Sequence, residues 1–404
     1  MIPLGLTATQ TAAYHRRLFS SHDYRIDLDI LDLNENPVGS ATFLDGQINL
    51  QTGEHVRRTA TLSISDPDGA LDFTGASAWS GSTIWVDRLV RIRHTIAVPG
   101  VGIRGDAVTV TCFVGPPSKI ARQGAEVSVE CQDKTALVTR GVSPYTVGKG
   151  ANAVNAIWSI LQRCTGEFRF RLGTTTRRLS RPYSVGWADE TSPWAIATAI
   201  AKNELGAQLI YSPDGYATLR KKPGSVALVV PGVTAEATSD LDLTTLINWV
   251  RVQGKVTTST KTGATTTTTS TSQPQSVAEA TSGNITPSAM ARKGVRRYLP
   301  RLVNEDAYTT TAQTSERARL ELVGGSRVDT APKFACIPFF HADVDDIVRF
   351  TVPGSDTDVR LTEASIPLGP NEMTVGAQRW VSAAPKTRMT NTYLRTRKVT
   401  RKKR

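Results

Sequence analysis

Alternating hydrophobic and polar positions dominate the first third of the chain and predict β-strands. The stretch YRIDLDILDL, which begins at Tyr24, alternates in this way, and the same habit recurs in ATFLDGQINL, RTATLSISD, LVRIRHTIAV, DAVTVTCFVG and AEVSVECQD. Turn-forming residues separate these runs, as at 66–69 and 115–117. Short strands at this spacing are typical of a sandwich or barrel. We therefore expect a first β domain over residues 24–142, preceded by an N-terminal arm at 1–23.

The pattern changes to a helical period near residue 143. Over 150–164 the apolar residues Val154, Ile157, Trp158 and Leu161 recur at helical spacing, and Gly166 is a suitable stop. This spacing predicts a helix whose buried stripe includes Trp158.

A second helix and a hairpin are expected over 187–223. Ser192 can cap the helix, Pro193 suits its first position and Gly206 its end. Two strand-like runs follow at 207–211 and 216–220, joined by a turn that contains Asp214 and Gly215. Together the two helices and the hairpin predict a smaller α/β domain over 143–224.

Strand patterns return beyond residue 225 and predict a second β domain over 225–383. Strands are expected at 246–256, 346–352, 358–366 and 372–380, and a helix at 309–323 with Ala318 and Leu322 facing inward. The segment 257–272 is rich in Thr and Ser, and we expect a β-hairpin whose tip is extended by a polar loop that becomes ordered against a neighbouring subunit. The loop residues that we expect at this contact are Thr260, Thr265, Thr267 and Thr269. The predicted fold class is α+β and β-rich.

Positive charge is concentrated at the C-terminal end. The formal net charge is +12, and nine basic residues with no acid follow Pro385. We expect a flexible basic tail over 384–404. Its candidate partner-binding residues are Arg395, Arg397, Lys398, Arg401, Lys402, Lys403 and Arg404. Such a cluster suits phosphate, an acidic protein or solvent; because aromatic stacking residues are nearly absent, an acidic protein is favoured over DNA.

No residue pattern indicates catalysis, a cofactor or a metal. The four cysteines are widely spaced and predict buried free thiols. The GxGxxG pattern at 100–105 precedes a strand rather than a helix, so a hairpin tip is expected there, and 66–72 suggests a capped turn rather than a calcium loop. We also expect neither a membrane-spanning segment nor a signal peptide. A pair of acids placed by the fold, as in a glycosidase, remains an open alternative.

The order of motifs resembles a known family. FVGPPSKIARQGAEVSVECQDKTALVTRG is followed by SPWAIATAIAKNELGAQLIYSPDGYATLRKKP, and then by LINWVRVQGKV, which carries Asn248, Val250, Val252 and Gly254. TTTAQTSERARLELVGG, HADVDDIVRF and RLTEASIPLGPNEMTVGAQR complete the series. Over residues 24–383 this series is similar to the tail hub, or minor tail, proteins of bacteriophages, including long-tailed phages of actinobacteria and the baseplate hubs of contractile tails.

The resemblance implies a structural, non-enzymatic protein. It implies two tail-tube-like β-barrel or sandwich domains interleaved with the α/β domain, and a homotrimeric ring at the virion tail tip, assembled in the bacterial host cytoplasm. The ring would adapt a sixfold tube to a threefold tip, contact a tail tube or distal tail protein on one side and a tip, spike or fibre protein on the other, and surround the DNA exit channel without specific DNA binding. The alternative is a tail-associated hydrolase or carbohydrate-binding protein that acts on the host envelope.

Overall fold

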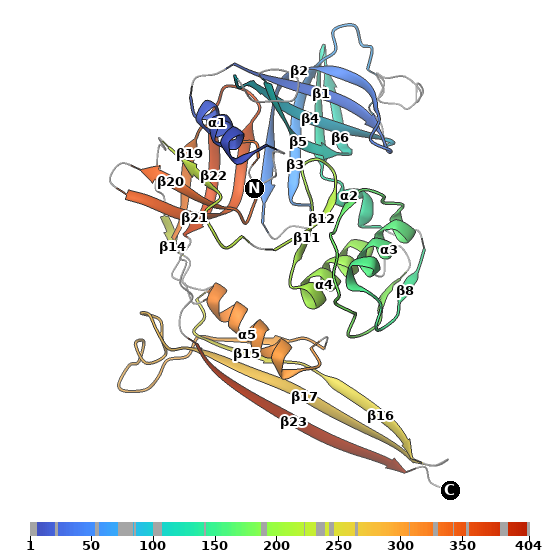
Figure 1. Ribbon diagram of the computed structural model, residues 1–404, viewed down its shortest axis with the longest axis vertical. Helices are drawn as coiled ribbons and strands as arrows, with labels where there is room; N and C mark the ends of the chain where they lie inside the picture. Colours follow the sequence, from blue (N-terminus) through green and yellow to red (C-terminus); the bar gives the residue numbers. More distant parts are fainter. Residues whose placement is uncertain are drawn as a thin grey trace. The chain divides into compact units, whose positions relative to one another are not determined.

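The structure, a computed structural model, describes residues 6–20, 23–52, 56–71, 84, 86–99, 107–140, 143–186, 192–221, 223–231, 239–241, 246–262, 266–306, 308–325, 330–341, 343–352, 355–379 and 387–401. The chain divides into two compact units (Figure 1). Unit 1 consists of Met1–Ser239 and Ala331–Trp380, and unit 2 of Asp240–Thr330 and Val381–Arg404. Unit 2 therefore combines an internal segment with the C-terminal end. In the described part, no helix is long and apolar enough to cross a membrane.

Most of unit 1 is one large β-sheet. Its main path runs β19–β22–β21–β2–β1–β4–β5, and β3, β6, β7, β13 and β20 branch from it. The strands are β1 (Tyr24–Asp32), β2 (Pro37–Gln51), β3 (Arg58–Ser65), β4 (Arg88–Ala97), β5 (Ala107–Gly115), β6 (Pro117–Gln123), β7 (Glu126–Gln132), β13 (Leu228–Val230), β19 (Thr330–Cys336), β20 (Ile347–Val352), β21 (Ser355–Pro367) and β22 (Met373–Arg379). β14 (Ser239–Leu241) lies at the boundary between the units.

The expected separation into two β domains is not confirmed. β2, from the first expected domain, pairs antiparallel with β21, from the second, with Ile48 opposite Ile366. Strands from both ranges thus share one sheet, and the described strands close into no barrel. Part of the range 225–383 belongs instead to unit 2. The β-rich α+β class is confirmed.

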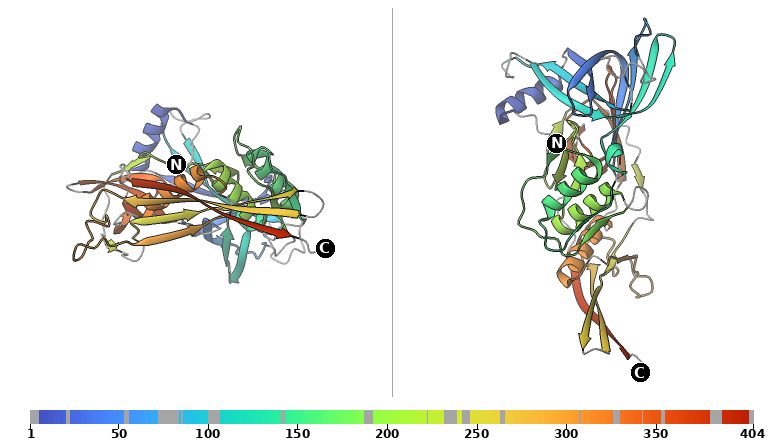
Figure 2. Two further views of the ribbon diagram at one scale, coloured as in Figure 1. Left: turned by 90° about the horizontal axis from the view of Figure 1, so that it is seen from below. Right: turned by 90° about the vertical axis from the view of Figure 1, so that its right-hand side faces the viewer.

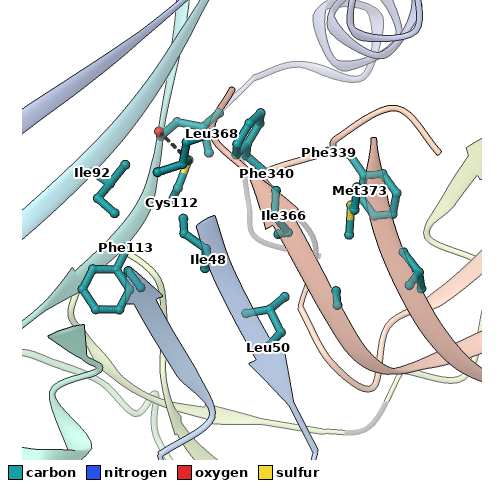
Figure 3. Packing of buried hydrophobic residues seen from close by; sticks show 14 of the residues in the cluster. Ile48, Leu50, Ile92, Cys112, Phe113, Phe339, Phe340, Ile366, Leu368 and Met373 are labelled. Atoms are coloured by element: carbon teal, nitrogen blue, oxygen red, sulfur yellow. Dashed lines mark hydrogen bonds between the residues drawn. The ribbon is translucent and has the colours of Figure 1, made fainter. Parts of the chain in front are cut away.

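The β2–β21 junction runs through the main hydrophobic core. Figure 3 shows Ile48 and Leu50 of β2 between Phe113 on one side and Ile366 on the other. Nearby, Cys112 donates a hydrogen bond to the carbonyl of Val110 at 3.4 Å and is fully buried (Figure 3). Burial raises the pKa of Cys112 to about 12, so its thiol behaves as a small apolar group. All four cysteines are buried and free, which confirms the prediction for these residues.

The N-terminal region contains a helix that the sequence patterns did not indicate. α1 (Ala8–Leu18) starts at a capping box formed by Thr7 and Gln10. It buries Tyr14 and Leu18 completely in the main core. His15 lies on the same helix, and its Nε2 is 3.0 Å from Nε2 of His341.

The α/β module of unit 1 follows the sequence prediction closely. It contains α2 (Thr135–Val138), α3 (Ala153–Thr165), α4 (Pro193–Leu205), the pair β8 (Tyr145–Val147) and β10 (Tyr183–Val185), and the three-stranded sheet of β9 (Phe170–Arg171), β11 (Gln208–Tyr211) and β12 (Ala217–Arg220). Gly166 and Gly206 end α3 and α4 in the left-handed conformation, with φ of 78° and 61°. Ser192 caps α4 as expected.

One residue of the expected α3 stripe lies outside the core. Ile157 and Leu161 are fully buried, but Trp158 is 41% exposed. The stripe is instead completed by Ala153, Ala156, Ile160 and Cys164. Because successive residues of an α-helix are about 100° apart, these buried residues lie on a face centred near Ile157 and Cys164, which leaves Trp158 outside it.

Unit 2 is a mixed sheet covered by one helix. Its elements are β15 (Trp249–Gln253), β16 (Val256–Thr262), β17 (Thr266–Ala280), β18 (Pro300–Asn304), β23 (Thr387–Arg401) and α5 (Thr311–Gly325). Ala318 and Leu322 of α5 are fully buried against this sheet, as predicted. Both views of Figure 2 show β23, in red, running beside β17.

The Thr-rich segment forms a hairpin of β16 and β17, as expected, and its strands cover described positions for which a polar loop is predicted. One expectation for unit 2 is corrected, because the expected flexible tail forms β23 over Thr387–Arg401. Threonine favours strands, and β23 carries threonine, valine and tyrosine among its basic residues. An extended strand also spaces charges by about 3.3 Å per residue, which limits their repulsion.

The histidine pair predicts a pH-dependent stability. Burial, and then the nearby His15, lowers the pKa of His341 from 6.5 to about 3, and burial lowers the pKa of His15. Below pH 6.5 the unfolded chain therefore binds a proton that folded His341 does not accept until about pH 3. The contribution of neutral His341 to the free energy of unfolding is therefore fully present above pH 6.5. It is lost as the pH decreases, by up to about 1.4 kcal/mol per pH unit for each such group.

We expect His341→Gln to show a shallower loss of stability than the wild type between neutral pH and about pH 4.5. Urea unfolding at a series of pH values measures both slopes. Equal slopes for the two proteins would contradict the assignment to His341.

Candidate assembly surfaces and buried charge clusters

The candidate residues of the basic tail and the Thr-rich segment meet in one ladder. β17 pairs along its full length with β23, from Thr266 opposite Arg401 to Ala280 opposite Thr387. Its other edge pairs with β16 and then with β15. Two segments far apart in the sequence thus become adjacent strands, a pairing that no local pattern could indicate.

Hydroxyl residues lie opposite the basic residues across this ladder. Arg395, Arg397 and Lys398 face Ser272, Ser270 and Thr269, and Arg401 faces Thr266. Thr260 faces Thr268, and Thr267 faces both Lys261 and Thr400. The ladder therefore places no like charges opposite one another at these positions, where they would be destabilising. Thr265, Lys402, Lys403 and Arg404 lie outside the described residues.

In unit 2, a buried asparagine just before β15 holds the segment that leads into β18. Asn248 is fully buried, and its side-chain nitrogen donates to the carbonyls of Ile285 at 3.0 Å and Arg297 at 2.9 Å. Its side-chain oxygen accepts from the backbone N–H of Leu299 at 2.7 Å. One amide therefore satisfies backbone groups of the segment that leads into β18.

The glycine of the same motif is required by close packing. A Cβ atom at Gly254 would lie 2.0 Å from the carbonyl oxygen of Tyr308. Val250 and Val252 between these two positions are fully buried. The Asn-x-Val-x-Val-x-Gly pattern thus corresponds to β15. Its valines are buried, and it is flanked by the hydrogen-bonded Asn248 and the closely packed Gly254.

In unit 1, a lysine cluster connects the sheet with the α/β module. Lys134 Nζ lies 2.8 Å from Glu35 and 3.1 Å from Glu167, and the side chains of all three are 3% exposed. Arg169 also pairs with Glu35 at 2.6 Å, and Tyr211 donates to Glu167 at 2.5 Å. Burial, together with the charge of Glu167, raises the pKa of Tyr211, so its phenol remains a hydrogen-bond donor.

A second cluster surrounds the turn before β20. Arg220 of β12 donates to Asp343 at 2.8 Å and also pairs with Asp346. Arg57 pairs with Asp345 at 3.0 Å, and Arg58 lies 3.5 Å from Asp343. Asp345 adopts φ of 70°, an uncommon conformation for a residue with a side chain.

The carboxylates of both clusters have cationic partners. These carboxylates are buried and accept from arginine or lysine, which leaves them poorly placed to act as a free acid–base pair. The described residues contain no group of three or more His, Cys, Asp or Glu side chains that could hold a metal ion. Asp66 accepts from the backbone N–H of Ala70 at 2.8 Å, which confirms a capped turn there. The 100–105 glycine pattern lies outside the described residues.

The fold is similar to that of solved phage tail proteins. The 43 kDa tail protein of prophage MuSo2 from Shewanella oneidensis matches with a TM-score of 0.54 and 11% identity, over 87% of this chain and 98% of that one. The tail protein from Neisseria meningitidis MC58 matches with a TM-score of 0.53 and 10% identity, over 88% of this chain and 96% of that one. No protein-family model and no curated protein sequence matches the chain. The resemblance to phage tail proteins is thus confirmed at the level of the fold.

Removing the cation of the lysine cluster should destabilise unit 1. Lys134→Met leaves Glu35 and Glu167 buried with less compensation, and we expect a loss of about 3–5 kcal/mol in the free energy of unfolding. Lys119→Met is the matched control, because Lys119 is 68% exposed and pairs with Glu130 at the surface. Chemical denaturation compares the two; equal effects would show that the cluster is dispensable.

The close approach at Gly254 gives a separate test in unit 2. Gly254→Ala forces a methyl group against a backbone carbonyl, and we expect a loss of about 1–3 kcal/mol or more. Gly324→Ala is the control, since a Cβ there meets no atom within 4 Å. Thermal unfolding measures both changes, and an unchanged midpoint for Gly254→Ala would contradict the packing argument.

Proposed function

We propose that this chain is a structural hub protein of a bacteriophage tail. The observation that carries the proposal is the fold match to two phage tail proteins over 98% and 96% of their own lengths. The match covers the sheet-rich architecture as a whole rather than one common motif. The role assigned to the chain is to build part of the tail, and no enzymatic activity is assigned to it.

In this proposal three copies form a closed ring at the tail tip, around the channel through which DNA leaves the virion. Closed rotational symmetry makes each subunit contribute the same two contact surfaces. The ring adapts a sixfold tail tube, or a distal tail protein, to a threefold tip, spike or fibre. Assembly takes place in the bacterial host cytoplasm.

In this proposal the ladder of β16, β17 and β23 forms a subunit contact. Among the described strands β23 pairs with β17 alone, so its second edge has backbone groups available for a partner. Strand edges of this length commonly add a strand from another chain. This assigns the Thr-rich and basic residues to assembly rather than to DNA binding.

The alternative of an envelope hydrolase or carbohydrate-binding protein has less support. The acids that the fold gathers in unit 1 are already paired with arginine or lysine. A hydrolase would instead require a carboxyl pair that remains available in a cleft.

Mass photometry and negative-stain averaging of the purified protein test the ring. We expect particles of about three times the 43.6 kDa subunit mass, with threefold symmetry and a central channel. Monomers at all concentrations, or sixfold rings, would remove the adaptor role. Release of sugar from host cell walls by the purified protein would favour the alternative.

A truncation separates the role of the strand edge from that of its charge. Removal of 387–404 should abolish ring formation, while the unfolding transition of unit 1 stays unchanged. The matched control keeps the strand but replaces Arg395, Arg397, Lys398 and Arg401 with threonine. We expect this control to form rings with weaker salt dependence. Normal rings from the truncated chain would show that β23 is not an assembly surface.

A further inference from the structure

An exposed tryptophan on the α/β module has no role in the core or in the proposed ring contact. Trp158 is 41% exposed on α3, and the neighbouring surface positions Asn155 and Gln162 are exposed polar residues. Its ring lies 6.2 Å from that of Phe170 on β9, at an angle of 56°. Phe170 supports the indole on one side and leaves much of its surface open to solvent.

The part of the module that contains α3 carries a local excess of positive charge. Residues 143–186 contain seven basic residues and one acid, Glu167. That acid is 3% exposed and is used by Lys134 inside the unit. The basic residues are Lys149, Arg163, Arg169, Arg171, Arg177, Arg178 and Arg181. Arg169 and Arg171 pair with acids from outside this range, Glu35 and Asp214. No ion pair with another described residue is found for the arginines at 163, 177 and 178.

Local contacts hold arginines at both ends of α3. At the start of the helix, the backbone carbonyl of Arg177 accepts from Ala153 at 3.0 Å, and Arg178 donates to the carbonyl of Gly150 at 2.9 Å. At its end, the guanidinium of Arg163 lies 5.0 Å from the ring centroid of Tyr145. Arg163, Arg177 and Arg178 are all exposed. We call Trp158, Phe170, Arg163, Arg177 and Arg178 the α3 patch.

We infer that the α3 patch is a docking site for an acidic segment of a partner protein, which places an apolar side chain against Trp158. Charge complementarity supplies the acidic character, because the arginines at the two ends of α3 have no acid within 143–186 except the buried Glu167. Tryptophan and arginine are the residues most enriched at energetically dominant positions of protein interfaces. Duplex DNA would engage the arginines through phosphates and would leave the indole without an apolar partner.

This inference goes beyond the proposed ring and is independent of it. Fluorescence anisotropy with the full-length protein tests it, using a short labelled peptide with the repeat Glu-Glu-Leu. Comparison probes are peptides with the repeats Glu-Glu-Ser and Gln-Gln-Leu, which remove the apolar and the acidic component in turn, and a duplex DNA of matching charge. We expect saturable binding of the Glu-Glu-Leu peptide and about tenfold weaker binding of the three others.

Surface variants locate the binding. Trp158→Ser should weaken binding of the Glu-Glu-Leu peptide about tenfold, and the double variant Arg177→Glu, Arg178→Glu should do the same and flatten the salt dependence. The matched controls are Leu302→Ser, at a position 66% exposed in unit 2, and the double variant Arg292→Glu, Lys293→Glu, at exposed positions of unit 2; both should bind as the wild type does. Circular dichroism and thermal unfolding check that each variant is folded.

Three results would overturn the inference. One is an absence of saturable binding by the Glu-Glu-Leu peptide. Another is equal binding of the Glu-Glu-Ser peptide together with no effect of Trp158→Ser, which would reduce the patch to nonspecific charge. The last is tighter binding of the duplex DNA than of the peptide, which would assign the patch to phosphate. Ring formation measured on the same samples reports separately on the proposed function.

Discussion

The buried carboxylates of the turn before β20 are the constraint on which unit 1 depends. Asp346 is fully buried and therefore needs a cation, because an unpaired charge in the interior costs several kcal/mol. Arg220 of the α/β module supplies it and also reaches Asp343, while Arg58 of β3 approaches the same turn. Three regions that are distant in the sequence must meet for these charges to be satisfied. The module is thus held against the sheet by specific pairing as well as by burial of apolar surface.

Such pairs add less to stability than their number suggests, because desolvation offsets most of the Coulomb attraction. Their effect is greater on the choice between alternative arrangements. A displaced module would leave Asp343 and Asp346 buried without Arg220, and Glu35 and Glu167 without the full set of partners around Lys134. An apolar contact of the same area would tolerate a shift more easily, since it has no direction.

Local structure could be predicted from the sequence, whereas long-range pairing could not. Helix caps such as Gly166, Ser192 and Gly206 act over only a few residues. The helices that begin or end at them are found where the spacing predicts them. α1 was missed because its buried face consists of little more than Tyr14 and Leu18. The basic composition of 387–401 indicates a flexible tail when it is taken alone. The strand that orders it, β17, lies more than a hundred residues earlier, so local composition could not reveal the pairing. Pairing of β2 with β21 likewise depends on strands about three hundred residues apart, and no spacing rule reaches so far.

The burial of Glu167 links the interior of the α/β module with the surface charge of residues 143–186. Glu167 is the single acid in 143–186, and its pairing with Lys134 removes it from the surface. Lys134 comes from outside this segment and is itself buried, so the Glu167 carboxylate is not available to the arginines at the two ends of α3. The net charge of +12 for the whole chain does not show where this excess lies. Position in the fold, rather than net charge, therefore decides where an acidic partner would be attracted.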